Sequence, residues 1–213
     1  MNNVPVIFLE GVLSRFFCKK LLLAGSALSG RLGQVASVAY AKGYCQYMWL
    51  RNGRLEEESC LNCQDQELDI ETLSRKHLRY TVLVIHADEE AYSTDPEAME
   101  RVLSATKGNH VLLSLQTSNI SEEIAKSVGS IRLVFQLYVD TKITSDVLKV
   151  MRSLVEKDTL NELLIAKDVE IDETAQLLVD LLKQKQFFRM FLPTKCSVVA
   201  LKEMIASSKE KSE

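Results

Sequence analysis

Residues 131–139 read Ile-Arg-Leu-Val-Phe-Gln-Leu-Tyr-Val, and this stretch decides the fold. Successive side chains of a β-strand point to opposite faces, so alternate residues share a face. The face that would carry Leu133 is apolar and the face that would carry Arg132 is half-polar. This difference favours a strand that is buried on one side only. One face would carry Leu133, Phe135, Leu137 and Val139, and the other would carry Arg132, Val134, Gln136 and Tyr138.

Similar apolar runs recur on both sides of this stretch. We predict strands at residues 82–87, 111–115, 131–139, 160–166 and 187–192. Helical patterns lie between them at about 95–106, 121–128, 145–157 and 172–185, with a last one at 197–207. Leu133, Leu160 and Phe187, taken as equivalent positions, are each 27 residues apart, within the leucine-rich-repeat range of about 20–29.

The alternation of strands and helices predicts parallel neighbours joined by right-handed connections. An open doubly wound sheet has helices on both faces, whereas a solenoid has them on one face and leaves the other in water. The half-polar side of residues 131–139 favours the one-sided arrangement. The run 187–192 is more uniformly apolar, so a doubly wound sheet stays as the alternative. We therefore predict an α/β fold with leucine-rich-repeat-like βα units, a parallel sheet and helices on one side.

Helix starts in this half of the chain are well marked. Asp95 precedes Pro96, and Pro is well tolerated in the first helical turn. Residue types that cap helix N-termini open the other helical patterns. These residues are Ser121, Thr144, Asp172 and Ser197.

The first 58 residues have a different pattern. Apolar residues at helical spacing predict a helix over about 5–17 and a second one from Ser29 to Gly43. The dipeptide Asn52-Gly53 is a strong hairpin signal, and it predicts strands at 44–51 and 54–58 with Trp49 partly buried. We accordingly divide the chain into a helical segment (1–43), a hairpin (44–58), a connection with one helical turn around 70–76 (59–79) and a βα repeat domain (80–213).

Composition narrows the class of protein. The 213 residues carry a formal charge of −3 and are 46% hydrophobic, which excludes global disorder and disfavours a dedicated binder of nucleic acid or anionic membranes. The sequence offers neither a secretory signal pattern nor an apolar stretch of about 20 residues. We therefore expect an intracellular protein, cytoplasmic or nuclear. An odd number of cysteines, namely five, favours reduced thiols.

One possible zinc-ligand set is Cys45, Cys60, Cys63 and His77. One tight C-x-x-C pair with two remote single residues is weaker than two tight pairs, so we expect no metal. Acidic residues at Glu56–Glu58 would raise rather than lower thiol pKa values, which disfavours redox chemistry.

The histidines give no catalytic constellation. His77, His86 and His110 are the only ones, and no G-x-S-x-G or Gly-rich phosphate loop occurs. The cluster Asp88–Glu90 follows a predicted strand, and we interpret it as a solvated turn rather than a metal site. We expect no catalytic residue and no cofactor.

Residues 4–16, VPVIFLEGVLSRF, resemble the opening of an F-box, in which a hydrophobe and a Pro precede spaced aliphatic positions. An F-box-like start, a hairpin and βα repeats together resemble the large nematode families of F-box-like and F-box-associated proteins. On this likeness the motif-core or adaptor-facing positions would be Val4, Pro5, Leu9, Val12, Leu13 and Phe16.

The resemblance implies a non-catalytic receptor. Its N-terminal helices would bind a Skp1-type adaptor, and its sheet would hold a protein destined for ubiquitin transfer. Arg132, Gln136 and Tyr138, on the half-polar face, are the expected recognition residues. The alternatives are a binding module without an adaptor, whose helices only cap the sheet, and an α/β enzyme with a site at the strand carboxyl ends. Exposed Leu9 and Phe16 would favour the adaptor, and buried ones the cap.

Overall fold

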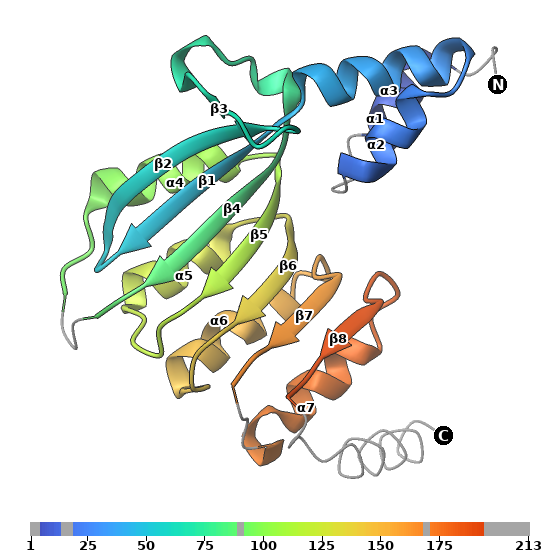
Figure 1. Ribbon diagram of the computed structural model, residues 1–213. Helices are drawn as coiled ribbons and strands as arrows, with labels where there is room; N and C mark the ends of the chain where they lie inside the picture. Colours follow the sequence, from blue (N-terminus) through green and yellow to red (C-terminus); the bar gives the residue numbers. More distant parts are fainter. Residues whose placement is uncertain (1–4, 14–18, 89–91, 168–170, 194–213) are drawn as a thin grey trace. The chain divides into compact units, whose positions relative to one another are not determined.

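The protein has an α/β fold in a computed structural model (Figure 1) that describes residues 5–13, 19–88, 92–167 and 171–193. The chain forms two compact units. Unit 1 comprises residues 1–48 and 57–82, and unit 2 comprises residues 49–56 and 83–213.

Strands of the described residues form one sheet with the order β3-β2-β1-β4-β5-β6-β7-β8. Its strands are β1 (Tyr44–Arg51), β2 (Arg54–Asn62), β3 (Glu67–Leu68), β4 (Leu78–His86), β5 (His110–Leu115), β6 (Val134–Val139), β7 (Glu162–Ile165) and β8 (Arg189–Phe191). β2 and β3 are antiparallel, whereas β5, β6, β7 and β8 pair in parallel in chain order. The predicted consecutive parallel arrangement is confirmed for these last four strands.

The helices alternate with the strands of unit 2, as predicted. They are α4 (Pro96–Thr106), α5 (Glu122–Ser130), α6 (Ser145–Val155) and α7 (Ile171–Leu182). Unit 1 contains α1 (Val6–Leu13), α2 (Lys19–Ser26), α3 (Gly30–Lys42) and the 3-10 turns η1 (Ile70–Thr72) and η2 (Arg75–His77). The predicted helix at 197–207 lies outside the described residues.

One of the predicted caps works as expected: Ser121 accepts a hydrogen bond from the Ile124 amide at the start of α5. Pro96 stands in the first turn of α4 as predicted, and Asp95 before it accepts a hydrogen bond from the Glu97 amide. Thr144 stands at the N-cap of α6, but its hydroxyl donates to the Ser118 carbonyl at 2.9 Å instead. Asp172 falls inside α7, which begins one residue earlier.

Helices cover one face of the sheet in unit 2. Figure 1 shows α4, α5, α6 and α7 all on the same side of the strands. Leu113, Leu137 and Leu163 lie side by side on the helix-facing side and are almost fully buried. The one-sided arrangement is therefore confirmed, and the opposite face of β5–β8 carries no helix among the described residues.

A β-bulge changes the faces predicted for residues 131–139. Val134 pairs with Val111 and Gln136 with Leu112, which makes Phe135 the extra residue on β6. Val134 is consequently buried in the core, and Phe135 is only half-buried. The prediction was wrong for these two residues because strict alternation fails at a bulge; it was right for Leu137 and Val139.

Other differences concern element boundaries. The helix α2 was not predicted, because its run of three leucines lacks the spacing of one amphipathic face. The predicted connection 59–79 contains the end of β2, the short strand β3 and both 3-10 turns. The hairpin prediction is confirmed, and both turn residues have positive φ, 47° at Asn52 and 72° at Gly53.

Unit 1 has a small core of its own. Leu13, Leu22, Ala36 and Cys63 form it, with Leu32, Val35, Ala39 and Tyr40 packed against them. α1 is held at its carboxyl end by Arg79, whose guanidinium is buried and donates to the Leu13 carbonyl at 3.2 Å. A cation at this helix end also interacts favourably with the helix dipole. Burial lowers the pKa of Arg79 below its ordinary value.

We predict that Leu137→Ala lowers the free energy of unfolding by about 2–5 kcal/mol, because it leaves a cavity at a fully buried position. Gln136→Ala, on the opposite face of the same strand, should lower it by less than about 1 kcal/mol. Urea denaturation of both variants measures the difference. Equal midpoint shifts would contradict the assignment of faces.

Candidate functional site

The face of β5–β8 that carries no helix among the described residues, which we call the open face, is built from aligned rows of side chains. The strand register defines two of these rows. The first contains Leu112, Gln136, Glu162 and Arg189, and the second contains Ser114, Tyr138, Leu164 and Phe191. Neighbouring strands lie about 4.8 Å apart, so each row is continuous across the four strands.

Arg189 lies at the β8 end of the open face and contacts three neighbouring side chains. Its guanidinium carbon lies 5.9 Å from the ring centroid of Phe188 and 5.7 Å from that of Phe191. One guanidinium nitrogen lies 3.4 Å from a carboxylate oxygen of Glu162 on β7. The Glu162 side chain is only 11% exposed, whereas that of Arg189 is 52% exposed. The charge presented to a partner is therefore positive.

A second feature is a line of rings at the amino-terminal ends of the strands. The His110 and Phe135 rings meet edge to face at 6.1 Å, and the Phe135 ring lies 6.3 Å from that of Phe188. The β-bulge makes this line possible, because it releases Phe135 from the core. Phe188 and Phe191 are 61% and 53% exposed. Apolar rings beside a half-exposed guanidinium are typical of a protein-binding surface.

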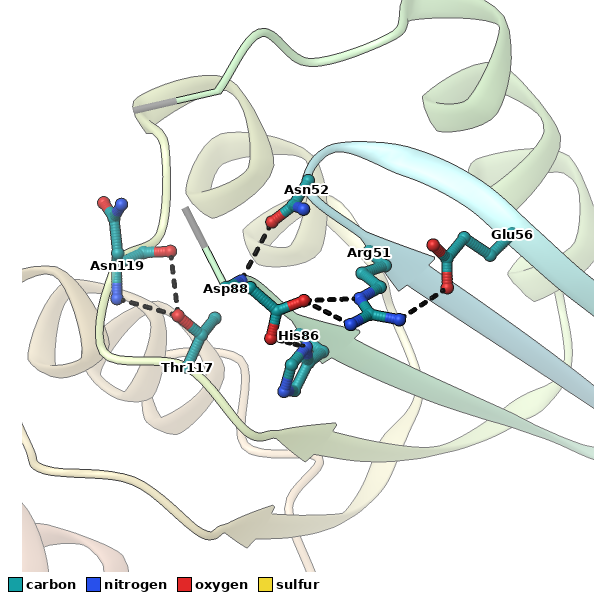
Figure 2. Close-up of polar contacts among 7 residues, drawn as sticks. All are labelled: Arg51, Asn52, Glu56, His86, Asp88, Thr117 and Asn119. Atoms are coloured by element: carbon teal, nitrogen blue, oxygen red, sulfur yellow. Dashed lines mark hydrogen bonds and ion pairs between the residues drawn. The ribbon is translucent and has the colours of Figure 1, made fainter. Parts of the chain in front are cut away.

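The carboxyl ends of β1 and β4 carry a polar cluster (Figure 2). Both Nε and Nη2 of Arg51 donate to one carboxylate oxygen of Asp88, and Nη1 lies 3.6 Å from Glu56. The other Asp88 oxygen lies 3.4 Å from Nδ1 of His86. The Asp88 hydrogen bonds raise the pKa of Arg51 further above its ordinary value.

This cluster also holds the hairpin turn in place. The Asn52 side chain accepts a hydrogen bond from the Asp88 amide at 3.0 Å, and the Asn52 amide donates to the His86 carbonyl at 3.0 Å. The Gly53 carbonyl accepts from the Asp95 amide at 2.9 Å, just before α4. These contacts make the cluster a structural clamp between a turn, a strand end and a helix start.

None of the described residues of the clamp is an activated nucleophile. Figure 2 also shows Thr117. Its hydroxyl donates a hydrogen bond to the Asn119 carbonyl and accepts one from the Asn119 amide. A nucleophile would need a hydrogen bond to His86, and no such contact links Thr117 to His86. The charges of Arg51 and Asp88 largely compensate each other. We interpret this site as one that supports the fold.

α1 in unit 1 differs from an ordinary amphipathic helix. Leu9 and Leu13 are 5% and 3% exposed, but Val6 and Phe8 on the same helix are 44% and 60% exposed. The neighbouring segments expose further large apolar residues. These are Leu21, Leu23, Leu28 and Val38.

The structure thus places the residues that the sequence nominated as partner-binding in different environments. In unit 1, Pro5 is exposed, Leu9 and Leu13 are buried, and Phe16 and the side chain of Val12 lie outside the described residues. In unit 2, Gln136 and Tyr138 are half-buried on the open face, and Arg132 is exposed just before β6. Sequence analysis missed Phe188, Arg189 and Phe191, although the run 187–192 with one Arg between aromatic residues was visible.

The three described cysteines of unit 1 are free thiols. Cys45, Cys60 and Cys63 form no disulfide, and burial raises the pKa of Cys45 and of Cys60 to about 11. Cys63 donates to the Gly43 carbonyl at 3.7 Å. Among the described residues, no three or more His, Cys, Asp and Glu side chains gather in a way that could hold a metal ion.

Comparison with known proteins adds no relative. No family model, no curated protein and no solved structure matches this chain. Within the part of the chain that the structure describes, no helix has the length and apolar character needed to cross a membrane. The proposals below therefore rest on the geometry of the described residues and on the F-box likeness.

Replacing Gly53 or Gly108 tests two separate costs of adding a side chain, namely backbone strain and steric overlap. Both have positive φ, 72° and 78°, but a Cβ on Gly53 would lie 2.7 Å from the Ser93 carbonyl oxygen, whereas one on Gly108 would meet nothing within 4 Å. We predict that Gly108→Ala costs about 1–2 kcal/mol from backbone strain alone. Gly53→Ala should cost more, because the turn must also move away from residues 93–94. Thermal and urea unfolding measure both, and an equal loss would show that the clamp is loose.

The thiols give a pH prediction. An unfolded thiol has a pKa near 9, and the folded Cys45 and Cys60 thiols have values near 11. The unfolded chain loses these protons first, so the free energy of unfolding should fall as the pH rises from about 9 to about 11. Cys45→Ala should make this fall shallower in urea titrations at several pH values. An unchanged slope would contradict the burial of this thiol.

Proposed function

We propose that the chain is a non-catalytic, intracellular protein-interaction protein, in which unit 1 binds a Skp1-type adaptor and the open face of unit 2 binds a substrate protein. The observation that carries this proposal is the exposure of Phe8 on a helix that already buries Leu9 and Leu13 in its own unit.

α1 is apolar nearly all round. Its sequence is VIFLEGVL, with Glu10 as the one charged residue. It packs against α3 and buries Leu9 and Leu13 in its own unit. A helix that is apolar on every side is normally covered on every side. Covering a side chain the size of Phe8 contributes about 1.5–3 kcal/mol, so a partner that buries it gains binding energy.

The exposed apolar residues of α2 and α3 support the same proposal. Leu21, Leu23 and Val38 are each about half exposed, and Leu28 stands in the turn before α3. Burying such side chains against a partner removes apolar area from water, which is favourable. The apolar helices of unit 1 are therefore better suited to a protein partner than to contact with water alone.

The F-box likeness of residues 4–16 identifies the proposed partner as a Skp1-type adaptor. Burial changes which residues would make the contact. Leu9 and Leu13 are occupied inside unit 1, so Phe8, which points to a different side of α1, would face the adaptor. The rival proposal, a binding module whose helices serve only as a cap, is favoured by the burial of Leu9 and Leu13, but it leaves Phe8 without a role.

We predict that Phe8→Asp reduces binding to a purified Skp1-type adaptor at least about tenfold, because a carboxylate would be buried in an apolar interface. Phe8→Leu, which keeps an apolar side chain, should retain most of the affinity. Isothermal titration calorimetry measures both, and circular dichroism checks that each variant is folded.

Leu9→Asp is the matched control at the neighbouring position. Leu9 is buried in unit 1, so this variant should lose stability in urea rather than lose binding selectively. Wild-type protein that binds no adaptor, or adaptor binding that Phe8→Asp leaves unchanged, would support the cap and refute the adaptor proposal.

A further inference from the structure

We propose that the open face recognises an extended peptide segment in which an acidic residue is flanked by apolar ones, with Arg189 as the selectivity determinant. This inference rests on the proposed function only in that the open face binds a protein; it does not require the adaptor. The three residues that carry it are Phe188, Arg189 and Phe191.

Charge complementarity favours an acidic partner residue. Among the described residues, Arg189 makes one ion contact, at 3.4 Å, with Glu162. A guanidinium has five N–H donors in a planar fork that fits a carboxylate, so one such contact leaves donors available. Glu162 is nearly buried and Arg189 is half exposed, so an approaching segment meets the cation and not the anion.

The rings on both sides of Arg189 favour apolar neighbours of that acid. The guanidinium carbon lies within 6 Å of the ring centroids of both Phe188 and Phe191. Both rings are more than half exposed, and Phe135 extends the apolar surface from Phe188 towards β5. An acidic side chain over Arg189 would therefore place its neighbours on the rings.

An extended segment suits this surface better than a helix or a nucleic acid does. The rows of the open face run across parallel strands. Alternate side chains of an extended peptide lie about 6.6 Å apart, close to the 6.1 and 6.3 Å between neighbouring ring centroids on this face. Nucleic acids also stack on exposed rings, but they require a positively charged track, whereas the two rows described above contain one cation, Arg189, and the whole chain carries −3.

The test is selection of random 12-residue peptides displayed on phage against the immobilised full-length protein. We expect enrichment of sequences with Asp or Glu between aliphatic or aromatic residues. Arg189→Glu should weaken an enriched peptide at least about tenfold in fluorescence anisotropy and should shift the selection to Lys or Arg. Arg189→Lys should keep the acidic preference with lower affinity.

Arg152→Glu is the control for the change of charge. Arg152 is exposed on α6, in the helix layer of the same unit, and its reversal should leave peptide binding unchanged. Phe188→Ala with Phe191→Ala should abolish binding of the enriched peptides. Circular dichroism confirms that these surface variants are folded.

Four results would overturn the inference. Enriched peptides without an acidic residue, lost on Phe188→Ala with Phe191→Ala, would refute the acidic preference but keep the open face as a protein-binding surface. No enrichment at all would refute both the acidic preference and the open face as a protein-binding surface. Oligouridine binding that Arg189→Glu abolishes would identify a nucleic acid as the occupant, and a wild-type dimer that the double Phe variant converts to a monomer would identify a second copy.

Discussion

The structure of unit 2 depends on burying one face of a parallel sheet against a single layer of helices. Leu113, Leu137 and Leu163 lie in register across β5, β6 and β7 and are almost completely removed from water. Each strand is followed by a crossover helix on the same side, so the helices complete this core and leave the opposite face to other uses. Everything that we assign to the open face follows from this asymmetry, because a doubly wound sheet would have covered it.

The bulge in β6 shows how a small irregularity shapes the candidate surface. It directs Val134 into the core opposite Val111 and leaves Phe135 as the extra residue. Phe135 then joins His110 and Phe188 in a line of rings. Bulges commonly redirect a side chain near a functional site, and here the redirected ring links the β5 end of the open face to the neighbourhood of Arg189.

The two candidate regions differ in their physical character. The clamp around Arg51 and Asp88 pairs its charges and fixes the Asn52-Gly53 turn, so it contributes to structure. The open face and α1 instead leave apolar area in water, at Phe188 in unit 2 and at Phe8 in unit 1. Apolar exposure costs free energy that only a partner recovers, which is why binding rather than chemistry is the function proposed for this protein.

The sequence by itself determined the α/β class, the parallel order of the later strands, the hairpin and the one-sided core, because alternation, turn residues and caps are local signals. Only the tertiary structure decided that Val134 and not Phe135 enters the core, since a bulge depends on the partner strand. The same holds for α1: spacing nominated Leu9 and Leu13 as partner-facing, but packing against α3 buries them and leaves Phe8 outside. A helix that is apolar on both sides carries no local signal of which side its own domain will take.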